Sequence, residues 1–136
     1  MRRFLLTLAC VLIFLPAQAN ERWQTLPPTP AAIPSSQAGQ APVNGISIHY
    51  AMYGHGSPVI FLHGGLANTD YWGLQVPAVA AHHTVILMDS RGHGRSTRDQ
   101  RPYGYDLMAD DVVALMDYLK IPKADIVGWS DGGILG

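Results

Sequence analysis

Three short apolar runs constrain the fold of this chain more than any other feature of its sequence. Residues 59–62 and 85–88 are continuous apolar stretches of strand length, and a third run lies within residues 124–128. Strands of this kind are typical of parallel sheets that are covered on both faces. Helical patterns separate the runs, over residues 70–81 and from about residue 106 to 120. The sequence therefore predicts an α/β fold, with a mostly parallel sheet and flanking helices.

The first 19 residues have the pattern of a secretory signal peptide. Arg2 and Arg3 give a positive start, residues 4–15 carry no charge, and Ala17 and Ala19 put small residues at the −3 and −1 positions. The uncharged run is shorter than the roughly 20 apolar residues that a membrane-spanning helix needs. We therefore expect cleavage after Ala19 and an exported protein, periplasmic or secreted, with no membrane contact after cleavage.

A proline-rich segment follows the expected cleavage site. Residues 20–42 contain five prolines together with serine and glycine, which is typical of an extended linker. We expect the folded domain to occupy residues 43–136. The one cysteine, Cys10, lies in the signal segment, so no intramolecular disulfide is expected.

The charge balance and the motif content exclude several classes of function. Nine basic and ten acidic residues give a net charge of −1, which does not indicate a nucleic-acid binder. The chain has neither a complete dinucleotide-binding loop nor a phosphate-binding P-loop. The pair Asp110-Asp111 is interpreted as charge near a helix N-terminus rather than as a metal or acid–base site. We expect no cofactor and no metal, and the oligomeric state is left open.

The strongest chemical signal is a G-x-S-x-G motif that starts at Gly128 and ends at Gly132. It follows the third apolar run and opens a helix, so Ser130 would lie on a tight strand-to-helix turn in a strained conformation. Side chains in place of the flanking glycines would collide with the neighbouring strand and helix. The N–H groups of the helix start would face developing negative charge. Ser130 is therefore the candidate nucleophile.

A second motif, His63-Gly64-Gly65, follows the first apolar run. Its small residues allow the backbone to approach the reaction centre. An N–H group of this loop, paired with the N–H of Asp131, would form an oxyanion hole with two donors.

With these motifs the sequence resembles the α/β-hydrolase superfamily over residues 44–136. The motifs that carry the resemblance are His63-Gly64-Gly65, the segment 89–96 and the segment 128–133. The last segment is the turn that carries Ser130, here called the elbow, and it is similar to that of biphenyl-hydrolase-like serine esterases. The resemblance implies that Ser130 is the nucleophile and that the N–H groups of Gly65 and Asp131 form the oxyanion hole. It further implies cleavage of ester, amide or lactone bonds of a small-molecule substrate through an acyl-enzyme.

The sequence departs from the family pattern after the elbow. The acid and the histidine of the family follow the nucleophile, whereas all six histidines of this chain precede Ser130. The only later carboxylate is that of Asp131. We therefore expect this chain to be the N-terminal part of a longer α/β domain that supplies both groups. The alternatives are a catalytically inactive fragment, or a binding or vestigial protein on the same scaffold, and a related enzyme that performs acyl transfer or a lyase step.

Overall fold

A computed structural model describes residues 28–136 of the chain. The expected signal peptide over residues 1–19 lies outside the described residues, and so does the first part of the expected linker. Among the described residues, no helix has the length and apolar character required to cross a bilayer.

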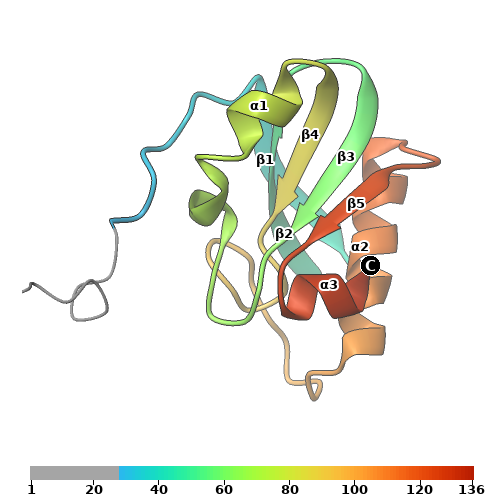
Figure 1. Cartoon of the computed structure of the whole chain (residues 1–136). Coiled ribbons are helices and arrows are strands. Elements are labelled where there is room, and N and C mark those ends of the chain that lie inside the picture. The colour runs from blue at the N-terminus through green and yellow to red at the C-terminus, as the bar shows by residue number, and fades with distance from the viewer. Residues whose placement is uncertain (1–27) are drawn as a thin grey trace, which may run out of the picture.

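The described residues form a five-stranded sheet with helices on both faces (Figure 1). The strands are β1 (Gln37–Val43), β2 (Ile46–Tyr53), β3 (Ser57–Leu62), β4 (His83–Met88) and β5 (Asp125–Gly128), in the spatial order β1-β2-β4-β3-β5. The strands that contain the three apolar runs, β3, β4 and β5, pair in parallel, as predicted. β2 pairs antiparallel with β4, and β1 pairs antiparallel with β2, so the complete sheet is mixed.

The boundary expected between linker and domain is wrong by six residues. β1 begins at Gln37 and pairs along its length with β2, from Gln37 opposite Met52 to Val43 opposite Ile46. β1 is an edge strand, where a proline such as Pro42 is tolerated because half of its backbone groups need no strand partner. The proline-rich composition therefore did not predict strand β1.

The first predicted helix is divided into two short pieces. Residues Thr69–Trp72 form a 3-10 helix, η2, which Asn68 caps by accepting a hydrogen bond from the Asp70 N–H at 2.9 Å. A separate helix, α1, covers Val76–Ala80 with Pro77 in its first turn. Proline lacks an N–H and is favoured in the first turn, where that N–H would have no partner. The second predicted helix is continuous as α2 (Tyr105–Leu119).

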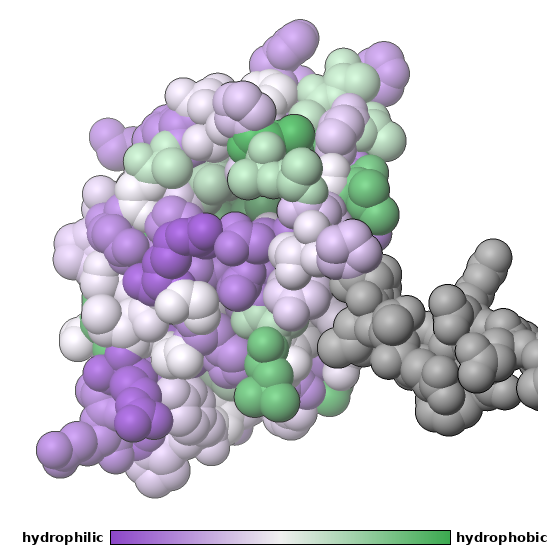
Figure 2. Space-filling view, turned by 90° about the vertical axis from the view of Figure 1, so that its left-hand side faces the viewer, coloured by the Kyte–Doolittle hydropathy of each residue, from purple (hydrophilic) through white to green (hydrophobic). Residues whose placement is uncertain are grey.

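Alternate residues of the central strands face two separate apolar layers. Ile60 and Leu62 face a cluster that includes Val112 and Leu115 of α2, whereas Val59 and Phe61 face a cluster with residues of η2 and α1. Figure 1 shows α1 on one side of the sheet, with α2 and the short α3 (Asp131–Leu135) on the other. The surface on the α1 side is mostly polar, with separate apolar patches (Figure 2).

The third apolar run differs from the other two in its exposure. β5 is an edge strand next to β3, and all four of its residues are exposed. In the described part of the chain no strand pairs with its outer side. Helix α3 follows it directly, so this edge carries the G-x-S-x-G turn.

A buried ion pair connects the loop after β4 to helix α2. The Arg91 guanidinium donates to both carboxylate oxygens of Asp111, from Nε at 2.7 Å and from one terminal nitrogen at 2.8 Å. Each of the two side chains is only 1% exposed. These hydrogen bonds, more than any other contact, raise the pKa of Arg91 and keep it charged. Asp111 is thus an ion-pair partner rather than a charge near a helix N-terminus, and only its neighbour Asp110 is exposed.

A second buried carboxylate holds two further loops against the end of β4. Asp89 is fully buried and accepts hydrogen bonds from the backbone N–H groups of Thr69 and Arg95, both at 2.7 Å. Because those residues belong to η2 and to the loop after β4, one side chain ties both segments to the carboxyl end of the sheet. This is the end at which Ser130 lies.

Candidate active site

Ser130 occupies a strained turn between β5 and α3. Its φ is 52° and its ψ is −119°, a combination that side-chain-bearing residues rarely adopt. The turn is fixed on both sides: the Trp129 N–H donates to the Leu62 carbonyl of β3 at 3.0 Å, and the Gly133 N–H donates to the Ser130 carbonyl at 2.8 Å. Strain of this kind persists at functional sites because the surrounding structure enforces it.

The two flanking glycines are required by close backbone contacts, as the motif predicted. A Cβ on Gly132 would collide with the Leu62 carbonyl of β3, and a Cβ on Gly128 would collide with the Gly132 carbonyl of α3. Both collisions are with backbone atoms, which cannot turn aside as a side chain can. The glycines therefore allow α3 to start close to β3 and β5.

We predict that Gly132→Ala destabilises the protein by about 1–3 kcal/mol, because the added methyl forces the start of α3 away from β3. Chemical denaturation monitored by circular dichroism measures the effect. Gly133→Ala is the matched control, since its Cβ would lie 3.7 Å from the nearest atom, an ordinary contact distance. Equal stabilities of the two variants would show that the turn does not need a glycine at position 132.

The loop after β3 lies directly against this turn. A Cβ on Gly64 would be 3.1 Å from the Cβ of Ser130, and a Cβ on Gly65 would be 2.7 Å from Oδ2 of Asp131. The structure thus brings Ser130, Asp131 and Gly65 together, as the motifs predicted, although the three come from two loops far apart in sequence. Trp129 is half exposed, and its ring centroid lies 6.4 Å from that of Tyr71.

His63 fixes the orientation of this loop through both of its ring nitrogens. Nε2 accepts from the Ser90 N–H at 2.9 Å, so Nδ1 carries the ring proton and donates to the Gly64 carbonyl at 2.7 Å. Because the peptide is planar and trans, the N–H of Gly65 points opposite to that carbonyl. Burial, the largest effect, lowers the pKa of His63 and favours the neutral ring that this arrangement requires.

We predict that His63 makes the protein less stable in acid. Its lowered pKa means that the unfolded chain binds the proton more readily, so this part of the stability is present above the ordinary pKa of 6.5 and is lost as the pH falls below it. Thermal unfolding between pH 7.5 and pH 5 measures the change. His63→Gln should flatten the pH dependence, whereas His55→Gln, at an exposed turn, should not. Parallel curves for all three proteins would contradict the prediction.

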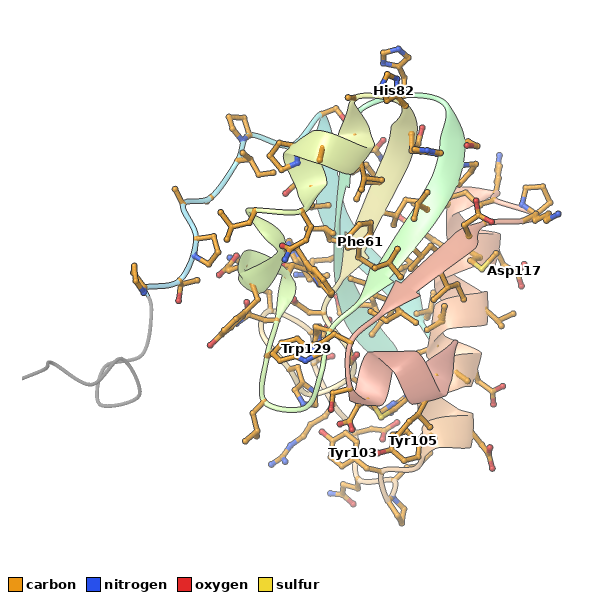
Figure 3. The ribbon with its side chains drawn as sticks, in the orientation of Figure 1. Phe61, His82, Tyr103, Tyr105, Asp117 and Trp129 are labelled. Carbon is orange, nitrogen blue, oxygen red and sulfur yellow. The ribbon has the colours of Figure 1, made fainter. Side chains whose placement is uncertain are left out.

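The remaining histidines are dispersed or engaged elsewhere. His93 lies 5.3 Å from His63 between ring centroids, and its Nδ1 donates to the Arg91 carbonyl at 3.0 Å. His83 pairs with Ser57 at 2.9 Å. His82 lies at the end of the sheet opposite Trp129 (Figure 3). In residues 28–136, no three histidine, cysteine or acidic side chains form a group that could hold a metal ion.

Two tyrosines that the sequence did not single out lie beside the elbow. Figure 3 shows Tyr103 and Tyr105 at the same end of the molecule as Trp129, next to α3. The Tyr105 hydroxyl donates to Oδ1 of Asp131 at 3.0 Å. A cavity of about 240 Å³ lies at this position, and it is lined by His93, Tyr103, Gly104, Tyr105, Met108 and Asp131. No motif links these residues, because their proximity depends on how α2 packs against α3.

Comparison with known families assigns the family of this fold. A family profile described as alpha/beta hydrolase fold matches residues 57–136, which is more than half of the chain. The chain belongs to the α/β-hydrolase family, as its motifs had indicated.

Individual relatives are hydrolases of small molecules. The 3-oxoadipate enol-lactonase 2 of Acinetobacter baylyi is 36% identical over 93 residues, which are 67% of this chain and 35% of the relative. The enol-lactonase structure from Burkholderia xenovorans LB400 is 34% identical with a TM-score of 0.70, over 72% of this chain and 39% of that one. An N-acyl homoserine lactone degrading enzyme is 40% identical with a TM-score of 0.68, over 71% and 38%. The chain therefore spans little more than a third of the length of these relatives.

Proposed function

We propose that this chain carries the nucleophile and the oxyanion hole of a serine hydrolase that cleaves ester, amide or lactone bonds through an acyl-enzyme. The observation that carries the proposal is the strained Ser130 turn with the Gly64-Gly65 loop packed against it. Ser130 Oγ attacks the carbonyl carbon while its proton passes to a general base, and the carbonyl oxygen becomes the oxyanion. Collapse of this intermediate breaks the bond to the alcohol or amine group, which leaves with that proton, and water then hydrolyses the acyl-enzyme. The backbone N–H groups of Gly65 and Asp131 donate to that oxyanion.

The proposal requires a general base for the Ser130 hydroxyl, because a serine is a weak nucleophile without one. His63 does not fit this role, since both of its ring nitrogens are bonded to backbone groups. We propose that the histidine and its acid come from residues after Gly136 in a longer chain, in the order nucleophile, acid, histidine. The lactonases among the relatives favour esters and lactones as the first substrates to test.

A burst experiment tests this function on the protein expressed from its complete reading frame. With an activated aryl ester, formation of an acyl-enzyme that hydrolyses slowly should release one equivalent of phenol per enzyme before the steady state. A lactone panel then defines the preferred ring. Absence of any turnover across esters, amides and lactones would instead favour a binding or vestigial protein on this scaffold.

We also propose that the protein is exported, with cleavage of residues 1–19 and a mature N-terminus at Asn20. The support is the signal-peptide pattern of the N-terminus. Mass spectrometry of the protein recovered from the periplasm or the medium should give a chain that starts at Asn20. A mature product that retains Met1 would contradict the proposal.

A further inference from the structure

Asp131 is one residue of the proposed oxyanion hole, and its carboxylate lies against the other, Gly65. Asp131 supplies one of the N–H donors through its backbone. Its Oδ2 faces the other donor residue, since a Cβ built on Gly65 would be 2.7 Å from this oxygen. A negative charge is therefore fixed beside the place where the reaction would create another.

This arrangement is unfavourable for an oxyanion unless the carboxylate charge is drawn elsewhere. Like charges close together repel, and the repulsion is stronger where water is partly excluded. An oxyanion hole works because its dipoles are aimed at developing negative charge before the reaction begins. A carboxylate that turned freely beside Gly65 would work against that field.

Tyr105 is placed to counter the charge. It is the first residue of α2, and its hydroxyl donates to Oδ1 of Asp131 at 3.0 Å. This hydrogen bond, followed by the charge of Asp131, raises the pKa of Tyr105, so the phenol remains a donor well above neutral pH. A hydrogen bond to a charged group is stronger than one between neutral groups.

We propose that Tyr105 is a positioning residue: through its hydrogen bond to Asp131 it holds the carboxylate in place and draws the carboxylate's negative charge away from the oxyanion formed at Gly65 and Asp131. The inference rests on the proposed function, and it assigns a role to a side chain outside the motifs. Tyr105 needs no contact with substrate for this role. Its effect should appear in the rate of acylation and only weakly in substrate binding.

A four-protein comparison tests the inference: wild type, Tyr105→Phe, Asp131→Asn and the double variant, each expressed from the complete reading frame. The acylation rate and the dissociation constant of one aryl ester are both obtained from the dependence of the burst rate on ester concentration. Tyr105→Phe should lower the acylation rate about tenfold, the factor expected for a lost hydrogen bond to a charged group. Its dissociation constant for the ester should stay within about twofold. In the Asp131→Asn background, where the carboxylate charge is gone, the same change should alter the rate less than about twofold.

Tyr118→Phe is the matched control, because Tyr118 lies on the same helix and is 47% exposed, against 46% for Tyr105. It should leave the acylation rate unchanged, and all variants should unfold within a few degrees of wild type. Two results would overturn this inference while leaving the proposed function intact. One is an equal loss of acylation rate from Tyr105→Phe in the wild-type and Asp131→Asn backgrounds, and the other is no loss in the wild-type background. Absence of acylation in wild type would overturn the proposed function and this inference with it.

Discussion

Replacing Asp111 by alanine should lower the free energy of unfolding by about 3–5 kcal/mol, the largest stability effect that we expect from one side chain. The reason is that Arg91 would keep its charge while losing the carboxylate that accepts two of its hydrogen bonds. At 1% exposure the guanidinium has almost no access to water as a substitute. Asp99, at 3.2 Å from the other terminal nitrogen, retains only part of the pairing.

Urea denaturation of wild type and variant measures this loss. Asp110→Ala is the control, since Asp110 is the preceding residue of the same helix and is exposed. It should change stability by less than about 0.5 kcal/mol. A loss from Asp111→Ala no larger than that of the control would show that the Arg91–Asp111 pair does not anchor the loop after β4 to α2.

Replacing Ser130 by alanine should lower kcat for ester hydrolysis by more than about a thousandfold, the largest effect on activity that we expect. In the proposed mechanism the variant loses the atom that attacks the carbonyl, while the proposed N–H donors of Gly65 and Asp131 are preserved. Slow residual turnover over the uncatalysed reaction is compatible with the mechanism, because binding and oxyanion stabilisation persist without the nucleophile.

The control for this change is Ser57→Ala, at the start of β3 and exposed. It should retain wild-type kcat, and Ser130→Ala should retain the wild-type unfolding midpoint. A Ser130→Ala variant with wild-type kcat would show that another group performs the attack.

The sequence predicted the sheet where the apolar pattern was dense. Residues 59–62 and 85–88 are continuous apolar runs, and β3 and β4 lie in the middle of the sheet with both faces covered. The sequence did not predict strand β1, because Pro42 and the prolines before it indicated a linker. Strand β1 depends on pairing with β2 rather than on its own composition. The local signal for that pairing is the Asn44-Gly45 turn between the two strands, where both residues have positive φ.

The sequence predicted those parts of the candidate site that depend on residues close together in the chain. The strain at Ser130 and the need for Gly128 and Gly132 follow from one tight turn, which a short motif describes. The partner of Arg91 and the hydrogen bond of Tyr105 to Asp131 span 20 and 26 residues, respectively. These contacts depend on how α2 packs against the sheet and α3, which no short motif encodes.

The most direct test of the account is covalent labelling of Ser130. The protein from the complete reading frame is incubated with a fluorophosphonate probe, and the adduct is mapped by peptide mass spectrometry. We predict one probe per chain, attached to the peptide that contains Ser130, and no adduct in Ser130→Ala. An adduct on a different residue, or an unlabelled protein that still hydrolyses esters, would contradict the assignment of Ser130 as the nucleophile.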